Sequence, residues 1–329
     1  MISKKIILVF IALLTGLAAC VPLPTSVALN TQTALPAGSP LPPPTLPAQA
    51  ASGAIRPAVP DFTHIMVIFF ENGNFVSVIG NQSMPYYNQL AGEYTLLSQY
   101  YAVSHPSLPN FIATFGRDTF GISSDCTDCF IQSASLPDQI KASGRTWRAY
   151  LEDMPRPCYL GNYLGYAQKH DPFIYFDPIR LDAARCNRSI VPLTQFDNDL
   201  AAGTLPNFVY IEPNLCNSAP NAKFDPACSL GNADHWLAGT MQKLLAYLQP
   251  RAAAEPYLIV VTWDEGQTNL SCCGLPSSAG GRVATLLISP LARKGFQDST
   301  PYTHYSLLKT IETGWSLPLL VHAADPGNA

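Results

Sequence analysis

Two pairs of neighbouring polar residues, each placed directly after an apolar run, offer oxygen ligands of the kind that bind a divalent cation. Asp264 and Glu265 end one run, and Glu71 and Asn72 end another. Adjacent carboxylates repel each other unless a cation lies between them. We therefore expect these four residues to hold a divalent metal ion, whose identity the oxygen ligands leave open. The alternative for Asp264 and Glu265 is that they are only a polar strand end that enters a turn.

The elements that must position these residues are two buried strands. The runs 64–70 and 257–263 have the length and the β-branched composition of such strands. If the strands lie parallel and side by side, their carboxyl ends bring the two polar pairs together. Further strands are expected over 147–151, 207–211 and 282–289, and helices over 234–248 and 306–312, the last capped by Ser306. This alternation predicts an α/β fold with a mostly parallel central sheet and helices on both faces.

A proline-rich loop offers a second group of polar side chains. Within the segment 104–110, prolines on either side of Ser107 rigidify the chain and present His105 and Asn110 in fixed directions. Fixed polar groups on a loop suit phosphate or metal binding. The alternative for His105 is a structural role in which a backbone hydrogen bond holds the ring.

The first residues have the pattern of an export signal. Two lysines precede an apolar run over 6–14, and the sequence Leu-Ala-Ala-Cys20 resembles the lipobox of bacterial lipoproteins. We expect a lipoprotein signal peptide over 1–20, a Pro-rich disordered tether over 21–59 and a single folded domain over 60–329. The protein would then be lipid-anchored in the cell envelope, facing outside the cytoplasm. An ordinary secretory signal with an incidental cysteine is the alternative.

Composition restricts the partners further. The formal charge is -4, 13% of the residues are charged and no basic cluster occurs, which argues against a nucleic-acid binder. Of the nine cysteines, eight remain when Cys20 is set aside, and an even number in an exported chain predicts disulfides of open connectivity. For Cys126 and Cys129 we favour a structural bridge over a redox or zinc half-site.

Six motifs occur along the chain in this order: Glu71-Asn72, His105-Pro-Ser-x-Pro-Asn110, Gly-x-x-Thr119, Asp264-Glu265, Gly281-Arg-Val283 leading to Ile288-Ser-Pro290, and His304-Tyr-Ser-Leu-Leu. In this order they resemble the bacterial phosphoesterase family of acid phosphatases and phosphatidylcholine-type phospholipases C, within the alkaline phosphatase superfamily. The resemblance covers roughly residues 62–317 and implies an alkaline phosphatase-like fold. It also implies hydrolysis of phosphate monoesters or phospholipid-type diesters with a divalent metal ion.

Carried onto this sequence, the resemblance assigns roles to individual residues. Thr119 is the expected nucleophile, with Ser107 and Ser123 as rivals, and a bound cation would activate its hydroxyl. The remaining expected catalytic residues are His105, His235 and His304, the expected phosphate-binding residues are Asn110 and His304, and the expected metal ligands are Glu71, Asn72, Asp264 and Glu265. His64, His170 and His322 have no motif support and are expected to be structural.

Two departures from the family pattern keep a second function open. Many members carry Asp-x-His where this chain has the segment 217–220, and Asp118 places a negative charge beside the expected nucleophile. The alternative function is a non-catalytic lipoprotein that binds phosphorylated ligands. A serine hydrolase is disfavoured, because the chain contains no Gly-x-Ser-x-Gly motif. The favoured function is an exported phosphoesterase, tethered to a membrane, that acts on phosphorylated small molecules or phospholipids.

Overall fold

The computed structural model describes residues 59–218 and 224–329, which all belong to one compact unit. The expected signal peptide, Cys20 and nearly all of the expected tether lie outside the described residues. Within the described part of the chain, no helix combines the length and the hydrophobicity needed to cross a bilayer.

Three buried parallel strands form the centre of the sheet. They are β1 (His64–Phe70), β5 (Phe208–Glu212) and β6 (Tyr257–Trp263), and every residue in them is buried. β1 pairs with β5 on one side and with β6 on the other, so that Phe70 lies opposite Trp263. Apolar runs without polar alternation suit strands that are covered on both faces. The predicted strands 64–70 and 257–263, and their parallel pairing, are confirmed.

The complete sheet has the strand order β4-β3-β5-β1-β6-β7-β2-β8, with β9 paired to β2. β7 runs antiparallel to both β6 and β2, whereas the other pairs are parallel. The mostly parallel sheet predicted from the sequence is therefore confirmed. The outer strands are β2 (Thr95–Tyr101), β3 (Trp147–Leu151), β4 (Ile190–Pro192), β7 (Arg282–Ile288), β8 (Phe296–Asp298) and β9 (Tyr302–Thr303).

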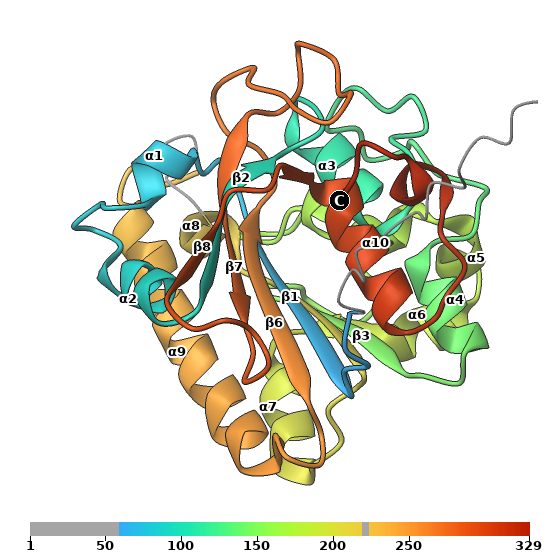
Figure 1. Ribbon diagram of the computed structural model, residues 1–329. Coiled ribbons are helices and arrows are strands. Elements are labelled where there is room, and N and C mark those ends of the chain that lie inside the picture. The colour runs from blue at the N-terminus through green and yellow to red at the C-terminus, as the bar shows by residue number, and fades with distance from the viewer. Residues whose placement is uncertain (1–58, 219–223) are drawn as a thin grey trace, which may run out of the picture. The chain divides into compact units, whose positions relative to one another are not determined.

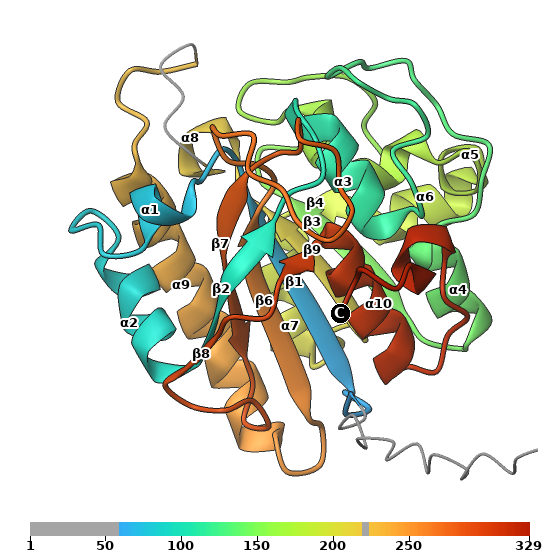
Figure 2. The same cartoon turned by 45° about the horizontal axis from the view of Figure 1, so that its top comes forward.

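Helices cover both faces of this sheet, as predicted. Figure 1 and Figure 2 show α9 with α2 and α7 along one face and α3 with α10 along the other. These helices are α2 (Pro85–Glu93), α3 (Ser107–Phe115), α7 (Thr194–Ala202), α9 (Leu230–Leu248) and α10 (His304–Gly314). Shorter helices are α1 (Phe75–Val78), α4 (Leu136–Ala142), α5 (Asp177–Arg180), α6 (Ala183–Ser189) and α8 (Leu215–Ser218). Four 3₁₀ turns, η1 (Gln168–His170), η2 (Pro172–Tyr175), η3 (Gln249–Arg251) and η4 (Val321–Ala324), complete the described elements.

The caps of two helices differ from expectation. Helix α9 begins before residue 234, because the Ser229 side chain accepts a hydrogen bond from the Asn232 backbone and caps an earlier turn. In α10 the predicted cap, Ser306, is wrong, because Thr303 occupies that position and accepts from the backbone nitrogen of Tyr305 at 3.1 Å. Ser306 instead accepts from the Thr303 backbone nitrogen at 3.0 Å, which completes a reciprocal capping box.

Disulfides join the cysteines of the described residues in pairs. Cys126 and Cys129 form a disulfide, so the bridge favoured from the sequence is present, and its structural role stays a prediction. The other bridges, whose connectivity the sequence left open, are Cys158–Cys186, Cys216–Cys228 and Cys272–Cys273.

Candidate active site

Acidic side chains lie at the ends of the three central strands, and we call them the carboxylate cluster. Glu71 follows β1, Glu212 ends β5, and Asp264 and Glu265 follow β6. None of the four residues has more than 6% of its surface exposed. The backbone nitrogen of Asn72 donates to Asp264 Oδ1 at 2.7 Å, so the two predicted polar pairs do meet at one sheet edge. Parallel pairing of the strands produces this convergence.

Ser107, the first residue of α3, joins the cluster from above the sheet edge. Its hydroxyl oxygen lies 3.0 Å from Glu71 Oε1 and 3.3 Å from Glu265 Oε1, and the residue is buried. The rest of α3 is buried against the sheet, which fixes the direction of this first turn. A serine hydroxyl held between two carboxylates is arranged to lose its proton and act as a nucleophile.

Lys169, in the 3₁₀ turn η1, brings a positive charge to the same hydroxyl. Its ammonium group forms an ion pair with Glu71, lies 3.2 Å from Ser107 Oγ and donates to Asp125 Oδ2 at 3.1 Å. Burial lowers the pKa of Lys169, but the neighbouring carboxylates, Glu71 first and then Asp125, raise it above its usual range. The ammonium therefore stays charged beside the hydroxyl.

His170 links two members of the carboxylate cluster. Its Nε2 lies 3.4 Å from Glu71 Oε2 and its Nδ1 lies 3.3 Å from Glu212 Oε1. His170 was expected from the sequence to be structural, and Lys169 and Glu212 were not expected at the site. Glu212 carried a usable signal, because it directly follows the predicted strand 207–211, just as Glu71 follows its own strand.

Burial and neighbouring charges shift the pKa values of the clustered carboxyl groups in different directions. Burial would raise the pKa of Glu71, but His170 and Lys169 hold that pKa below its usual range. Burial raises the pKa of Asp264 well above its usual range, and the charges of Glu265 and Glu71 raise it further. Burial likewise raises the pKa of Glu265 to about 7. Asp264 and Glu265 therefore hold their protons more tightly than free carboxyl groups do, and a bound cation would favour their ionised forms.

One oxygen in the cluster is well suited to a cation. Asp264 Oδ1 accepts from the backbone nitrogens of Asn72 and Glu265, whereas Asp264 Oδ2 is buried and accepts no hydrogen bond. A buried carboxylate oxygen without a donor is costly unless a cation or a proton compensates it. As the side chains lie, no three His, Cys, Asp or Glu residues in the described ranges are arranged to hold a metal ion. The unpaired oxygen of Asp264 and the carboxylates around it are nevertheless the donors that a hard divalent cation prefers. Ligation by the four predicted residues stays a prediction.

The predicted histidines take three different positions. His105 lies at the edge of the cluster, where Nδ1 contacts Glu265 Oε2, Nε2 lies 3.2 Å from the carbonyl oxygen of Thr268, and 34% of the side chain is exposed. His304 is fully buried behind the cluster, with Nε2 at 2.7 Å from the carbonyl oxygen of Asp264. Burial lowers the pKa of His304 to about 4, so it supports Asp264 as a neutral ring. His235 is exposed on α9, and no hydrogen bond or ion pair of the described residues connects it with the cluster.

Asn110 has a structural role in place of the predicted phosphate binding. Its Oδ1 accepts from the backbone nitrogens of Val103 and Ser104, at 2.9 and 3.0 Å. Its Nδ2 donates to the carbonyl oxygens of Ser104 and Pro106, at 2.9 and 3.1 Å. The amide is completely buried and its donors and acceptor are occupied, so it fixes the loop that leads into α3.

Thr119, the expected nucleophile, is not brought to the cluster. Its hydroxyl lies 3.5 Å from Asp118 Oδ1, and the residue lines a cavity of about 320 Å³ together with Tyr305 and His322. No hydrogen bond of the described residues connects Thr119 with the carboxylate cluster. Asp118 Oδ1 lies 3.8 Å from His322 Nε2, whereas the guanidinium group of Arg117 lies over the ring of Phe120.

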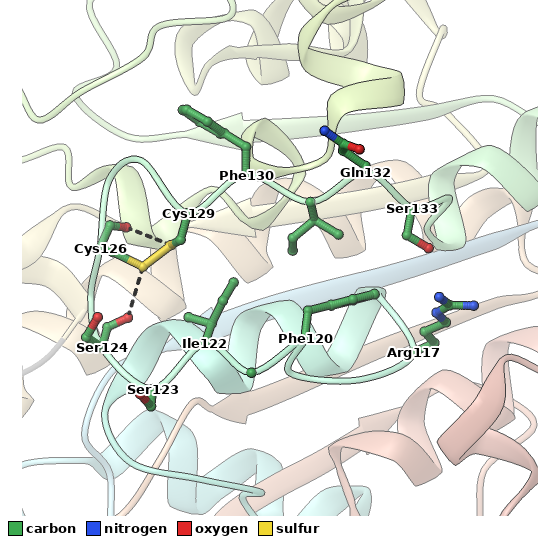
Figure 3. Close-up of a pocket in the computed structure, with 12 residues that line it drawn as sticks. Arg117, Phe120, Ile122, Ser123, Ser124, Cys126, Cys129, Phe130, Gln132 and Ser133 are labelled. Carbon is green, nitrogen blue, oxygen red and sulfur yellow. Dashed lines mark hydrogen bonds between the residues drawn. A yellow bond between two sulfur atoms is a disulfide. The ribbon is translucent and has the colours of Figure 1, made fainter.

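Ser123, the other rival nucleophile, lines a different cavity of about 540 Å³. Figure 3 shows this cavity between the segments 117–124 and 129–133, with the Cys126–Cys129 disulfide at one end. None of its lining residues belongs to the carboxylate cluster. Of the three hydroxyl groups considered from the sequence, that of Ser107 is the one that contacts the carboxylate cluster within the described residues.

Comparison with known proteins gives concordant results. The model of the Phosphoesterase family matches residues 77–318. A phosphate-repressible acid phosphatase of Penicillium chrysogenum is 32% identical over 272 residues, which cover 79% of this chain and 60% of that protein. A phosphatidylinositol-3-phosphatase of Mycobacterium tuberculosis is 28% identical over 280 residues, which cover 83% of each chain. Among solved structures, an alkaline phosphatase superfamily protein of Vibrio parahaemolyticus gives a TM-score of 0.52 at 13% identity, covering 79% of this chain and 68% of that one, which shows a shared fold.

Proposed function

The chain belongs to the phosphoesterase family, and from this premise we propose that it is an enzyme that hydrolyses phosphate monoesters, with Ser107 as the nucleophile. The observation that carries the proposal is the Ser107 hydroxyl, which lies within hydrogen-bond distance of Glu71, Glu265 and Lys169 together. The names of the relatives, acid phosphatase and phosphatidylinositol-3-phosphatase, support monoesters over the diesters considered from the sequence. The chain spans 60% of the length of the Penicillium enzyme, so activity and substrate remain our proposal.

In the proposed reaction, Ser107 Oγ attacks phosphorus in line with the departing alcohol. The phosphorus–Oγ bond forms while the bond to the leaving oxygen breaks, and the leaving oxygen takes the electron pair and then a proton from water. The hydroxyl proton of Ser107 passes to Glu265 Oε1, which faces it at 3.3 Å. Glu71 is the weaker base, because His170 and Lys169 hold its pKa below the usual range. Water then attacks the phosphoserine, inorganic phosphate leaves, and Ser107 regains its proton.

The chain's own side chains prepare this step. Glu71 and Glu265 orient the hydroxyl, and His105 holds Glu265 from the exposed side of the cluster. A divalent cation held by Glu71, Asn72, Asp264 and Glu265 would supply Lewis-acid stabilisation of the negative charge on the phosphate. The unpaired Asp264 Oδ2 supports such a cation.

Ser107 replaces Thr119 in the proposal for reasons of position. Both residues carry a hydroxyl, and neither is acidic enough to act without help. The Ser107 hydroxyl has two carboxylate oxygens and an ammonium group around it, whereas the Thr119 hydroxyl lies 3.5 Å from Asp118 Oδ1. We also propose that the protein is exported and anchored through Cys20, a proposal supported by the signal sequence alone.

Release of inorganic phosphate by the purified protein tests the proposed function. Suitable substrates are p-nitrophenyl phosphate, phosphatidylinositol 3-phosphate in vesicles, and phosphatidylcholine as the diester control. We expect turnover of at least one monoester and a covalent phosphoserine at residue 107 after acid quenching of the reaction. Binding of phosphate esters without any turnover would instead establish the non-catalytic alternative.

A further inference from the structure

We propose that Lys169 is a catalytic residue whose ammonium group stabilises the negative charge on Ser107 Oγ. The inference rests on the proposed function, because it gives Lys169 a part in the same reaction. The charge on Oγ develops twice, once when the hydroxyl loses its proton before attack and again when the phosphoserine is hydrolysed and Oγ departs from phosphorus. Lys169 keeps its own proton throughout both steps.

The contacts of the ammonium group direct it toward this oxygen. Lys169 Nζ lies 3.2 Å from Ser107 Oγ, 3.1 Å from Asp125 Oδ2 and in direct contact with Glu71 Oε1. An ammonium group has three N–H donors, so these three acceptors account for all of them. Preorganised donors of this kind stabilise developing charge without rearranging during the reaction.

Asp125 ties the lysine to the start of α3. Its Oδ1 accepts from the backbone nitrogen of Leu108, the residue after Ser107, at 3.0 Å, while its Oδ2 accepts from Lys169. One carboxylate therefore holds both the lysine and the turn that carries the proposed nucleophile. We infer that Asp125 is a positioning residue.

The backbone that precedes Lys169 is also fixed. Gln168 is completely buried, and its side chain donates to the Thr127 carbonyl oxygen at 2.8 Å and accepts from the Gly161 backbone nitrogen at 2.8 Å. These bonds anchor the turn η1 between two loops. Lys169 thus projects from a rigid support, which suits a residue that must keep its distance to a reacting atom.

A purely structural role is the competing explanation. Lys169 could serve only as the counter-ion of buried Glu71, since an unpaired buried carboxylate is strongly destabilising. A counter-ion affects folding stability, whereas a donor to Ser107 Oγ affects kcat in a protein that remains folded. Replacement of the lost N–H donor from solution distinguishes the two roles.

The test is chemical rescue of Lys169→Ala in the full chain. We expect kcat for p-nitrophenyl phosphate to fall roughly 100- to 1,000-fold, the loss typical of a preorganised donor. Ethylammonium ions should restore activity with saturation, and tetramethylammonium ions at equal ionic strength, which lack an N–H donor, should not. Lys243→Ala is the matched control, because that lysine is half exposed and forms a surface ion pair with Asp197.

Each outcome decides the inference. A folded Lys169→Ala protein with wild-type kcat overturns it, and so does a folded, inactive variant that ethylammonium leaves inactive. If circular dichroism shows that Lys169→Ala does not fold, Lys169→Gln, which keeps an N–H donor without the charge, takes its place. Wild-type kcat in Lys169→Gln overturns the role of the charge, and a loss of at least tenfold supports it. A wild-type protein without turnover overturns the proposed function as well, whereas the variant results leave that function intact.

Discussion

Replacement of Ser107 by alanine should abolish phosphate release, while the same change at Thr119 should have little effect. The Ser107 hydroxyl is the one that faces Glu71, Glu265 and Lys169, and alanine removes it without adding volume. Loss of a nucleophile commonly reduces kcat by several powers of ten. We expect a loss of roughly 10⁴-fold, which corresponds to about 5.5 kcal/mol of transition-state stabilisation.

The structure also sets the expected effects on stability. Ser107→Ala removes a hydrogen-bond partner from two buried carboxylates and a lysine, so the free energy of unfolding should fall by about 1–2 kcal/mol. Thr119→Ala removes one long hydrogen bond, of 3.5 Å, to the partly exposed Asp118. Its free energy of unfolding should fall by less than about 1 kcal/mol, and its kcat should stay within roughly twofold of wild type because no step depends on it.

Steady-state kinetics with p-nitrophenyl phosphate and urea unfolding followed by circular dichroism measure both quantities. Acid quenching and mass spectrometry should locate the phosphoryl group on residue 107 in wild type and find none in Ser107→Ala. Retention of more than a tenth of the wild-type kcat by folded Ser107→Ala would refute the assignment. A large loss in Thr119→Ala, with phosphate found on Thr119, would restore the original expectation.

Three further predictions concern the metal ion, a buried acid and the anchor. Removal of divalent metal with a chelator should abolish phosphate release. Asp264→Asn should lose most of the phosphate release, whereas the exposed control Asp197→Asn should not. Full activity in a verified metal-free sample would exclude a required metal. Burial raises the pKa of Asp171 to about 7 from an ordinary 3.8, so its stabilisation is complete below pH 3.8 and is lost as the pH rises through 7. Three pKa units correspond to about 4 kcal/mol in the free energy of unfolding. Urea unfolding at several pH values should show that Asp171→Asn lacks this part of the pH dependence. An unchanged dependence of the free energy of unfolding on pH would contradict the burial argument. Cys20→Ser should release active protein from the membrane fraction, and equal fractionation of both forms would reject the lipid anchor.

The central strands were predictable because their burial leaves a direct trace in the sequence. A strand covered on both faces needs apolar residues at every position, so the runs 64–70 and 257–263 match β1 and β6 in both bounds. Helix starts are less direct. Thr303 and Ser306 each carry a hydroxyl, and in the capping box each side chain accepts a hydrogen bond from the other residue's backbone nitrogen. Composition alone therefore does not show which of them is the cap.

The candidate site also contains some residues that were predictable from the sequence and others that were not. Residues at strand ends follow from topology, and Glu71 with Asp264 therefore lay within reach of sequence reasoning. Lys169 and His170 come from a turn between β3 and β4, and their place depends on the path of a long loop. That path is held by side-chain bonds such as the one from Gln168 to the Thr127 carbonyl oxygen, which no periodicity reveals.

The position of the nucleophile depended on where one helix begins. The prolines around Ser107 predicted a loop over 104–110, but α3 starts at Ser107 itself, and Asn110 fixes the chain just before it. This start puts Ser107 in the first turn, directed at the strand ends. From Ser107 to Phe115 the helix advances by roughly 12 Å, at 1.5 Å per residue, before the chain reaches Thr119. Thr119 lies beyond the C-terminal end of this helix, where its hydroxyl contacts Asp118, and no hydrogen bond of the described residues connects it with the carboxylate cluster. The start of α3 thus gives Ser107, and not Thr119, the contacts with acidic side chains at the strand ends.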